Sequence, residues 1–214
     1  IWIPHRAPIG HSPGHVDLEG FWARLAEAGV PFVLHVGGAP LQVARDWGNN
    51  GRGAVKDWLG GGENVRTKDA AVLHQTPEMF ISMLLLDGVF DRHPTLSGAA
   101  VELGAGWVPE LCRRLDWVCR IYGRSDTSVR FERSPSEQLK EQMGFTPFSH
   151  EHVGDLVADS AADLYLFSSD YPHLEGTKDP IGRFERSLVD VEESVKEAFY
   201  SENFLRLWPE ARVS

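Results

Sequence analysis

The sequence has few cysteines, no long apolar run and fewer basic than acidic side chains. Its two cysteines, Cys112 and Cys119, lie seven positions apart in an expected helix. At a helical rise of about 1.5 Å per residue their Cα atoms would be about 10 Å apart, which is too far for a disulfide. Because there is also no CxxC pair, we expect a reducing, cytoplasmic compartment.

The charge and hydropathy of the chain argue against two classes of partner. The longest apolar run, Met83 to Leu86, is far shorter than the ~20 residues that a membrane span needs. The net charge is −10, and the 21 lysines and arginines are scattered along the chain. We therefore expect neither a membrane nor nucleic acid as a partner.

Short apolar runs alternate with amphipathic stretches along the whole chain. Expected strands cover 1–3, 31–36, 99–103, 144–148 and 164–168. Expected helices cover 17–29, with Asp17 as N-cap, 76–93, 187–199 and 201–208. Three further helices are indicated by an apolar stripe from Trp107 to Val118, by a capping box at 134–137 and by an apolar face from Val153 to Val157. This alternation predicts an α/β fold with parallel strands, either an open doubly wound sheet or part of a barrel. In both folds, functional sites lie beyond the carboxyl ends of the strands.

Three segments carry further expectations. The apolar run PFVLHV (31–36) is typical of a strand buried on both faces. The chain opens on Ile1-Trp2-Ile3-Pro4, which resembles the tail of a strand, so we expect a fragment or a processed product that lacks its beginning. The glycine-rich segment 48–62 is expected to be a flexible surface loop or a lid that borders the same cavity as 170–177.

Two side chains at strand ends are candidate metal ligands. His35 ends an apolar strand, and Asp170 follows the strand 164–168 and begins the turn Asp170-Tyr171-Pro172-His173. Each has an ordinary structural explanation, a satisfied core histidine for His35 and a turn-capping aspartate for Asp170. Together, at the same end of one parallel sheet, they indicate a binding site.

A Pro/Gly-rich loop near the start of the chain holds three more histidines. His5, His11 and His15 follow the first strand tail, and we expect them to be mostly solvated, on a loop that faces the same rim as His35. Other functional motifs are incomplete or missing. The sequence has no Gly-x-Ser-x-Gly, and Gly104-Ala-Gly106 lacks the third glycine of a dinucleotide-binding fingerprint.

Several short segments occur in an order that a known family shares: PFVLHVGG (31–38), GVFDRHP (88–94), VELGAGWVP (101–109), PSE (135–137), SDYPH (169–173) and SEN (201–203). They resemble the amidohydrolase-related family that includes aminocarboxymuconate-semialdehyde decarboxylase. The resemblance implies a (β/α)8 TIM barrel, of which this chain carries roughly strands 4 to 8. Residues 1–214 would then be the C-terminal portion of a single metal-dependent hydrolase barrel domain.

The resemblance also implies a site. His35 matches the metal-binding histidine of the fifth strand, and Asp170 matches the metal-binding aspartate of the eighth, which also serves as the catalytic proton acceptor. The family's first-strand His-x-His pair has no counterpart in this chain. Leu103 stands where the sixth strand commonly has a histidine. Its neighbour Glu102 is not a simple replacement, because adjacent side chains on a strand point to opposite faces.

The expected cofactor is one divalent metal, with zinc first and manganese second, and such an ion lowers the pKa of bound water to about 7. The expected activity is hydrolysis or non-oxidative decarboxylation of a small cyclic or aromatic carboxylated substrate. Trp107, Tyr171 and His173 are the candidate substrate-binding residues. The alternative is a non-catalytic binding or structural protein on the same scaffold. By analogy, the resemblance also suggests a homodimer.

Overall fold

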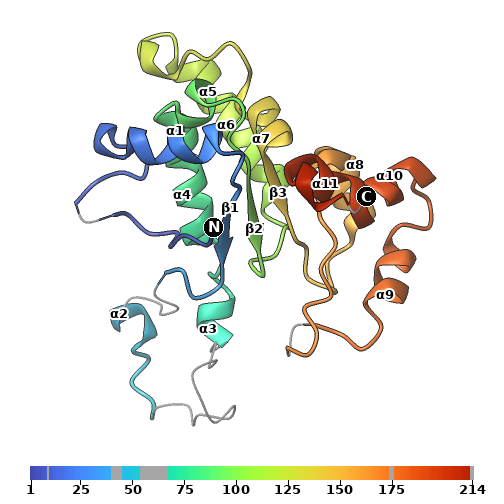
Figure 1. Cartoon of the computed structure of the whole chain (residues 1–214). Helices are drawn as coiled ribbons and strands as arrows, with labels where there is room; N and C mark the ends of the chain where they lie inside the picture. The colour runs from blue at the N-terminus through green and yellow to red at the C-terminus, as the bar shows by residue number, and fades with distance from the viewer. Residues whose placement is uncertain (9, 40–44, 54–66, 174–175, 213–214) are drawn as a thin grey trace.

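The computed structural model describes residues 1–8, 10–39, 45–53, 67–173 and 176–212. Three strands, β1 (Phe32–His35), β2 (Gly98–Val101) and β3 (Met143–Phe145), form a parallel sheet in that order (Figure 1). Single parallel bridges extend it on both sides, from Trp2 to Val33 and from Phe145 to Tyr165. The five expected strand positions therefore lie side by side in chain order.

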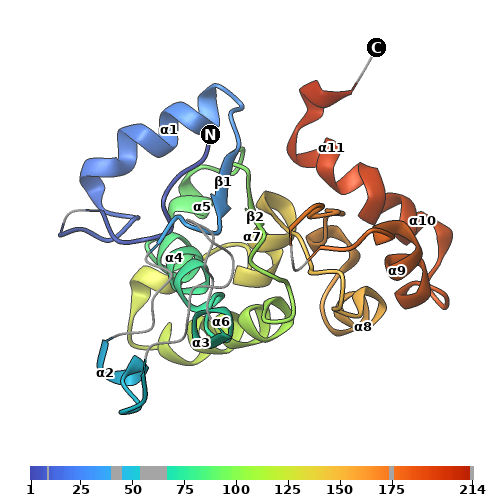
Figure 2. The same ribbon diagram turned by 90° about the horizontal axis from the view of Figure 1, so that it is seen from below.

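Helices connect these strands, and further helices form the C-terminal part of the chain. The α1 and α4 helices lie on the β1 side, and α8 to α11 lie on the β3 side (Figures 1 and 2). The helical elements are η1 (Val16–Leu18), α1 (Glu19–Glu27), α2 (Arg45–Gly48), α3 (Thr67–Ala70), α4 (Gln75–Leu86), α5 (Val89–Arg92), α6 (Val108–Tyr122), η2 (Thr127–Val129), α7 (Pro135–Gln142), α8 (Val153–Asp159), η3 (Ala162–Leu164), α9 (Pro180–Ser187), α10 (Glu193–Glu197), the π-helical η4 (Ala198–Glu202), α11 (Asn203–Leu207) and η5 (Pro209–Ala211).

Local signals predicted several of these elements correctly. The α7 helix begins with the expected capping box, in which the Ser134 hydroxyl accepts from the Glu137 backbone N–H at 3.3 Å. The Glu137 carboxylate in turn accepts from the Ser134 backbone N–H at 2.7 Å. The α6 helix buries Leu111 and Leu115 as its apolar stripe predicts. Cys112 and Cys119 both lie on α6 and are unbridged, as expected.

Other expected boundaries were wrong. The helix expected over 76–93 divides at Gly88, which has a φ of +74° and separates α4 from α5. Asp17 lies inside η1 and does not cap α1, because η1 precedes that helix and has His15 as its N-cap.

Two expected elements near the C-terminus also differ. The strand expected over 164–168 is reduced to the bridge at Tyr165, because residues 162–164 form η3. The helix expected over 187–199 is replaced by α9, which ends at Ser187, and by α10, which begins at Glu193. Asp179 explains the earlier start of α9, since its side chain accepts from the Gly182 backbone N–H at 3.0 Å.

The main core packs on one face of the sheet. Phe32, Leu34, Ala100 and Phe145 belong to this cluster, while a smaller cluster of Ala99, Leu166 and Leu207 packs separately. Along β1, Phe32 and Leu34 are buried, whereas Val33 and His35 are half-buried. The expectation that 31–36 is buried on both faces is therefore wrong, because only the Phe32 and Leu34 face packs on the main core. His35 consequently projects from the less covered face.

Within the described residues, none of the helices has the length and apolar character needed to cross a membrane. The glycine-rich segment 48–62 lies largely outside the described residues, which end at 53 and resume at 67, and the segment 170–177 has a gap at 174–175. Their expected common face and cavity therefore stay a prediction.

Candidate metal centre

His35 is the last residue of β1 and pairs in register with Val101, the last residue of β2. Its Nδ1 lies 2.9 Å from the carbonyl oxygen of Val36. Because a carbonyl only accepts, this contact puts a proton on Nδ1 and directs Nε2 away from the backbone. The strand end and this hydrogen bond thus orient Nε2 toward the edge of the sheet, as a metal-binding imidazole requires.

The carboxylate of Glu102 contacts that nitrogen. Its Oε2 lies 2.8 Å from His35 Nε2, and its side chain is 9% exposed. The β2 strand ends at Val101, and Glu102 has a φ of +58°, a left-handed conformation that is uncommon for a non-glycine residue. This turn reverses the alternation of the strand, so Leu103 enters the main core and the Glu102 carboxylate faces His35. The expectation that Glu102 points to the opposite face was wrong, because alternation holds only within a strand.

Asp170 and His173 approach from the segment that follows the Tyr165 bridge. The His173 backbone N–H donates to the Asp170 carbonyl at 2.9 Å and closes a tight turn. His173 Nδ1 lies 3.9 Å from Glu102 Oε1. Asp170 has a φ of +49°, and its Oδ2 atom is buried. The structure thus brings His35, Glu102 and His173 together, with Asp170 at the start of the same turn as His173.

His5 supports His35 from the neighbouring segment. Its side chain is buried, its Nε2 lies 3.0 Å from the His35 carbonyl oxygen, and its Nδ1 lies 2.9 Å from the Thr76 hydroxyl. Burial lowers the pKa of the His5 imidazole and outweighs the hydrogen bond to the His35 carbonyl, which raises it. A Cβ on Gly38 would lie 2.6 Å from the His5 ring, so a glycine is needed there. The expectation that His5 is solvated was therefore wrong.

The two aromatic candidates have different environments. Trp107 donates from its indole N–H to the Gly104 carbonyl at 2.9 Å, and its ring packs edge-on against Phe145 at 5.4 Å. Tyr171 is 63% exposed. Packing therefore accounts for the position of Trp107, while contact of either ring with a substrate stays a prediction.

Glu151 holds the loop that carries Glu102. Its carboxylate accepts backbone N–H groups from Ala105 at 2.9 Å, from Gly106 at 2.6 Å and from Phe148 at 2.6 Å. These charge-assisted bonds join the loop after β2 to the loop after β3. Glu151 could not be identified from the sequence, because no local motif marks a carboxylate that accepts backbone N–H groups from a distant loop. For Glu102 a signal existed, since Gly104 and Gly106 indicate that the strand ends before them.

The side chains at this edge are imidazoles and carboxylates, which are donors that zinc and manganese accept. Glu102 and Asp170 also hold a left-handed backbone, which is uncommon for non-glycine residues and recurs at functional sites. The donor chemistry and the strand-end location therefore fit a divalent metal. The fold and the site together define a parallel α/β protein with a candidate metal centre at the carboxyl edge of its sheet.

The family comparison agrees with this class. Residues 4–209 match the model of the amidohydrolase family, so the chain belongs to that family. The family resemblance inferred from the motifs is confirmed. A search of curated protein sequences finds no match.

Several solved structures have a similar fold. An amidohydrolase from Mycobacterium avium subsp. paratuberculosis K-10 is 27% identical with a TM-score of 0.75, over 97% of this chain and 50% of that one. A 2,6-dihydroxybenzoate decarboxylase from Rhizobium is 21% identical with a TM-score of 0.66, over 94% of this chain and 57% of its own. A dihydroxybenzoic acid decarboxylase from Polaromonas sp. JS666, with bound manganese, is 18% identical with a TM-score of 0.62, over 95% of this chain and 57% of its own. This chain thus spans about half the length of the solved structures that it matches.

Proposed function

We propose that residues 1–214 are the C-terminal portion of a (β/α)8 barrel domain, carrying roughly strands 4 to 8, of a metal-dependent enzyme. The proposed reaction is hydrolysis or non-oxidative decarboxylation of a small cyclic or aromatic carboxylated substrate. The convergence of His35, Glu102 and His173, beside Asp170, is the observation that carries this proposal. The decarboxylases of hydroxylated benzoates among the similar structures support the substrate class.

His35 and Asp170 would hold one divalent ion, and Glu102 would supply a further carboxylate oxygen in place of the histidine that the sixth strand lacks. When bound, the ion polarises a substrate oxygen and lowers the pKa of water. Imidazole favours zinc and carboxylate favours manganese. The manganese in the Polaromonas enzyme supports including that metal beside zinc.

The side chains would divide the remaining tasks. Asp170 would accept the proton of the attacking water in a hydrolytic reaction. His173 would donate a hydrogen bond to the substrate carboxylate, since its imidazole is 40% exposed beside the Glu102 carboxylate. Trp107 and Tyr171 would line a pocket for a flat ring. A small-molecule substrate, a homodimer and a cytoplasmic location complete the proposal.

One observation favours the competing class, a non-catalytic protein on the same scaffold. His35 Nε2 and Glu102 Oε2 lie 2.8 Å apart, within the range of a charge-assisted hydrogen bond. A site that has lost its reaction would keep such a pair as a structural contact. Metal content discriminates between the two classes, because only the enzyme needs the ion.

The test uses the full protein in which this chain occurs and two of its variants, His35→Ala and Asp170→Ala. We expect the unaltered protein to bind about one zinc or manganese ion at this centre and to release CO2 or a hydrolysis product from a panel of hydroxylated benzoates and cyclic amides. Both variants should lose activity and most of the metal bound at this centre. Glu110→Gln, on the exposed face of α6, is the control. A metal-free, inactive protein would support the non-catalytic class, and unchanged metal in both variants would exclude these two ligands.

A further inference from the structure

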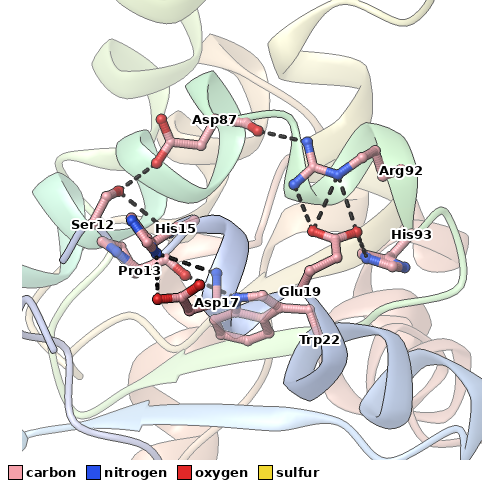
Figure 3. Close-up of polar contacts among 10 residues, drawn as sticks. Ser12, Pro13, His15, Asp17, Glu19, Trp22, Asp87, Arg92 and His93 are labelled. Carbon is pink, nitrogen blue, oxygen red and sulfur yellow. Dashed lines mark hydrogen bonds and ion pairs between the residues drawn. The ribbon is translucent and has the colours of Figure 1, made fainter.

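A second group of potential metal ligands lies outside the site described above. His11, His15 and Asp17 offer ligand atoms that all lie within 4.8 Å of one another. The two imidazole rings stack with their centroids 4.0 Å apart and their planes at 7° (Figure 3 shows His15 and Asp17). Asp17 Oδ2 lies 3.7 Å from His11 Nε2 and 3.6 Å from His15 Nδ1. We propose that these three side chains bind a zinc-class divalent ion independently of the candidate metal centre.

The distances suit such an ion. Zinc binds nitrogen and oxygen at about 2.0–2.2 Å, so the donor atoms of a tetrahedral site lie roughly 3.4 Å apart. The two contacts to Asp17 Oδ2 are within a few tenths of an ångström of this separation. Rotations of both histidine side chains would also be needed, because the two imidazole planes are nearly parallel and their lone pairs do not point at one ion. The side chains are 41%, 36% and 69% exposed for His11, His15 and Asp17, so they are free to make them.

The backbone that carries the ligands is held in place. The His11 N–H donates to the Pro8 carbonyl at 2.8 Å, and the His15 N–H donates to the Ser12 carbonyl at 3.0 Å. The Trp22 indole N–H donates to the Pro13 carbonyl at 2.8 Å in a buried contact. These bonds fix the turn between the two histidines, so an ion would not have to order a flexible loop.

One existing contact would change on binding. The Asp17 backbone N–H donates to His15 Nδ1 at 3.2 Å. An ion bound to that nitrogen would replace this long hydrogen bond, and the exposed N–H would bond to water instead. His15 also lines a cleft of about 850 Å³, beside Ser12 and Asp87, which leaves room for water ligands.

This group belongs to a different part of the molecule from His35. The Ser12 hydroxyl donates to the carboxylate of Asp87, which caps the C-terminal end of α4 (Figure 3). That helix end leads toward the start of β2, whereas His35 lies at the end of β1. The expectation that His11 and His15 share the rim of His35 was therefore wrong, and His5 alone of the three contacts His35.

The test measures zinc binding by competition with a chromophoric chelator. The full protein carries His35→Ala in every sample, so that zinc at the proposed active site does not contribute. Against this background we compare His11→Asn/His15→Asn with the matched control His152→Asn. His152 also pairs with one carboxylate, Asp155 at 3.2 Å, but His152 and Asp155 do not belong to a three-ligand group among the described residues.

We expect the double variant to bind zinc about 100-fold more weakly or worse, because two of three ligands are gone, and the control to be unchanged. In nitrogen-15 spectra of the background protein, zinc should shift the imidazole resonances of His11 and His15. If the double variant loses its circular dichroism signal, Asp17→Asn replaces it and should weaken binding at least tenfold. Equal zinc affinity in the background, the variant and the control overturns the proposal, as does a background protein that binds no zinc at micromolar concentration.

Discussion

The carboxylate of Glu102 lies 2.8 Å from Nε2 of His35, at the ends of two neighbouring parallel strands. The contact depends on the left-handed backbone of Glu102, which turns an acidic side chain toward an edge where an alternating strand would have placed Leu103. In the proposed metal centre it would add a carboxylate to the two ligands that the family resemblance implies.

The first prediction concerns this carboxylate. Glu102→Gln should weaken metal binding to the full protein by about 10- to 100-fold, because an amide oxygen carries no charge and is a poorer ligand. Metal affinity is measured by titration with zinc and with manganese. Glu110→Gln, which removes an exposed carboxylate paired with Arg113 at 3.2 Å, should leave the affinity unchanged. Equal affinities in both variants would show that Glu102 does not take part in metal binding.

The second prediction tests packing between β1 and β2. A Cβ on Gly98 would lie 2.5 Å from the Phe32 ring, so Gly98→Ala should lower the free energy of unfolding by about 1–3 kcal/mol. Gly20 lies inside α1, and a Cβ there would meet nothing within 4 Å. Gly20→Ala should therefore stabilise the protein by about 0.5–1 kcal/mol. Urea denaturation measures both, and effects of the same sign would contradict this account.

The third prediction concerns the loop clamp at Glu151. Glu151→Gln should lower the free energy of unfolding by about 1–3 kcal/mol, because one of the acceptor oxygens for the N–H groups of Ala105, Gly106 and Phe148 is lost. Hydrogen exchange at Ala105 and Gly106 should become faster. Glu132→Gln, which removes an exposed carboxylate, is the control. Unchanged exchange at both amides would exclude the clamp.

The fourth prediction is a pH dependence. Hydrogen bonds from Arg92, and then from His93, hold the pKa of Glu19 below its ordinary value of 4.5. A lowered carboxyl pKa stabilises the folded state above pH 4.5, and this contribution is lost as the pH falls through the folded-state pKa. Glu19→Gln should therefore be less stable than the unaltered protein at pH 6, by no more than about 1 kcal/mol since the pair is partly exposed. The difference should disappear in acid.

Thermal or urea unfolding between pH 2 and pH 7 provides the measurement. Glu27→Gln is the matched control on the same helix, because its partner Arg24 is 3.5 Å away and both side chains are largely exposed. It should give no pH-dependent difference. A constant gap between Glu19→Gln and the unaltered protein at every pH would contradict the assigned cause.

Elements that depend on nearby residues were predictable from the sequence. The capping box at Ser134 and Glu137 joins groups three positions apart, and the stripe of Leu111 and Leu115 follows from helical geometry alone. The parallel direction of the strands followed from their alternation with helices. His35 became a candidate because it stands at a predictable strand end, and Asp170 because it begins a predictable turn; their role as metal ligands stays a prediction.

The orientation of side chains beyond the strand ends depended on contacts between distant segments. Glu102 turns toward His35 in a loop that Thr146 of the next segment supports, by accepting the Glu102 backbone N–H at 3.0 Å. His5 is buried because Thr76 and the His35 carbonyl, far along the chain, bond to its ring. The sequence by itself thus determined several helices, the parallel direction of the strands and two candidate ligands. Only the tertiary structure decided how Glu102 and His5 join them, because the groups that hold those two residues meet only when the chain is folded.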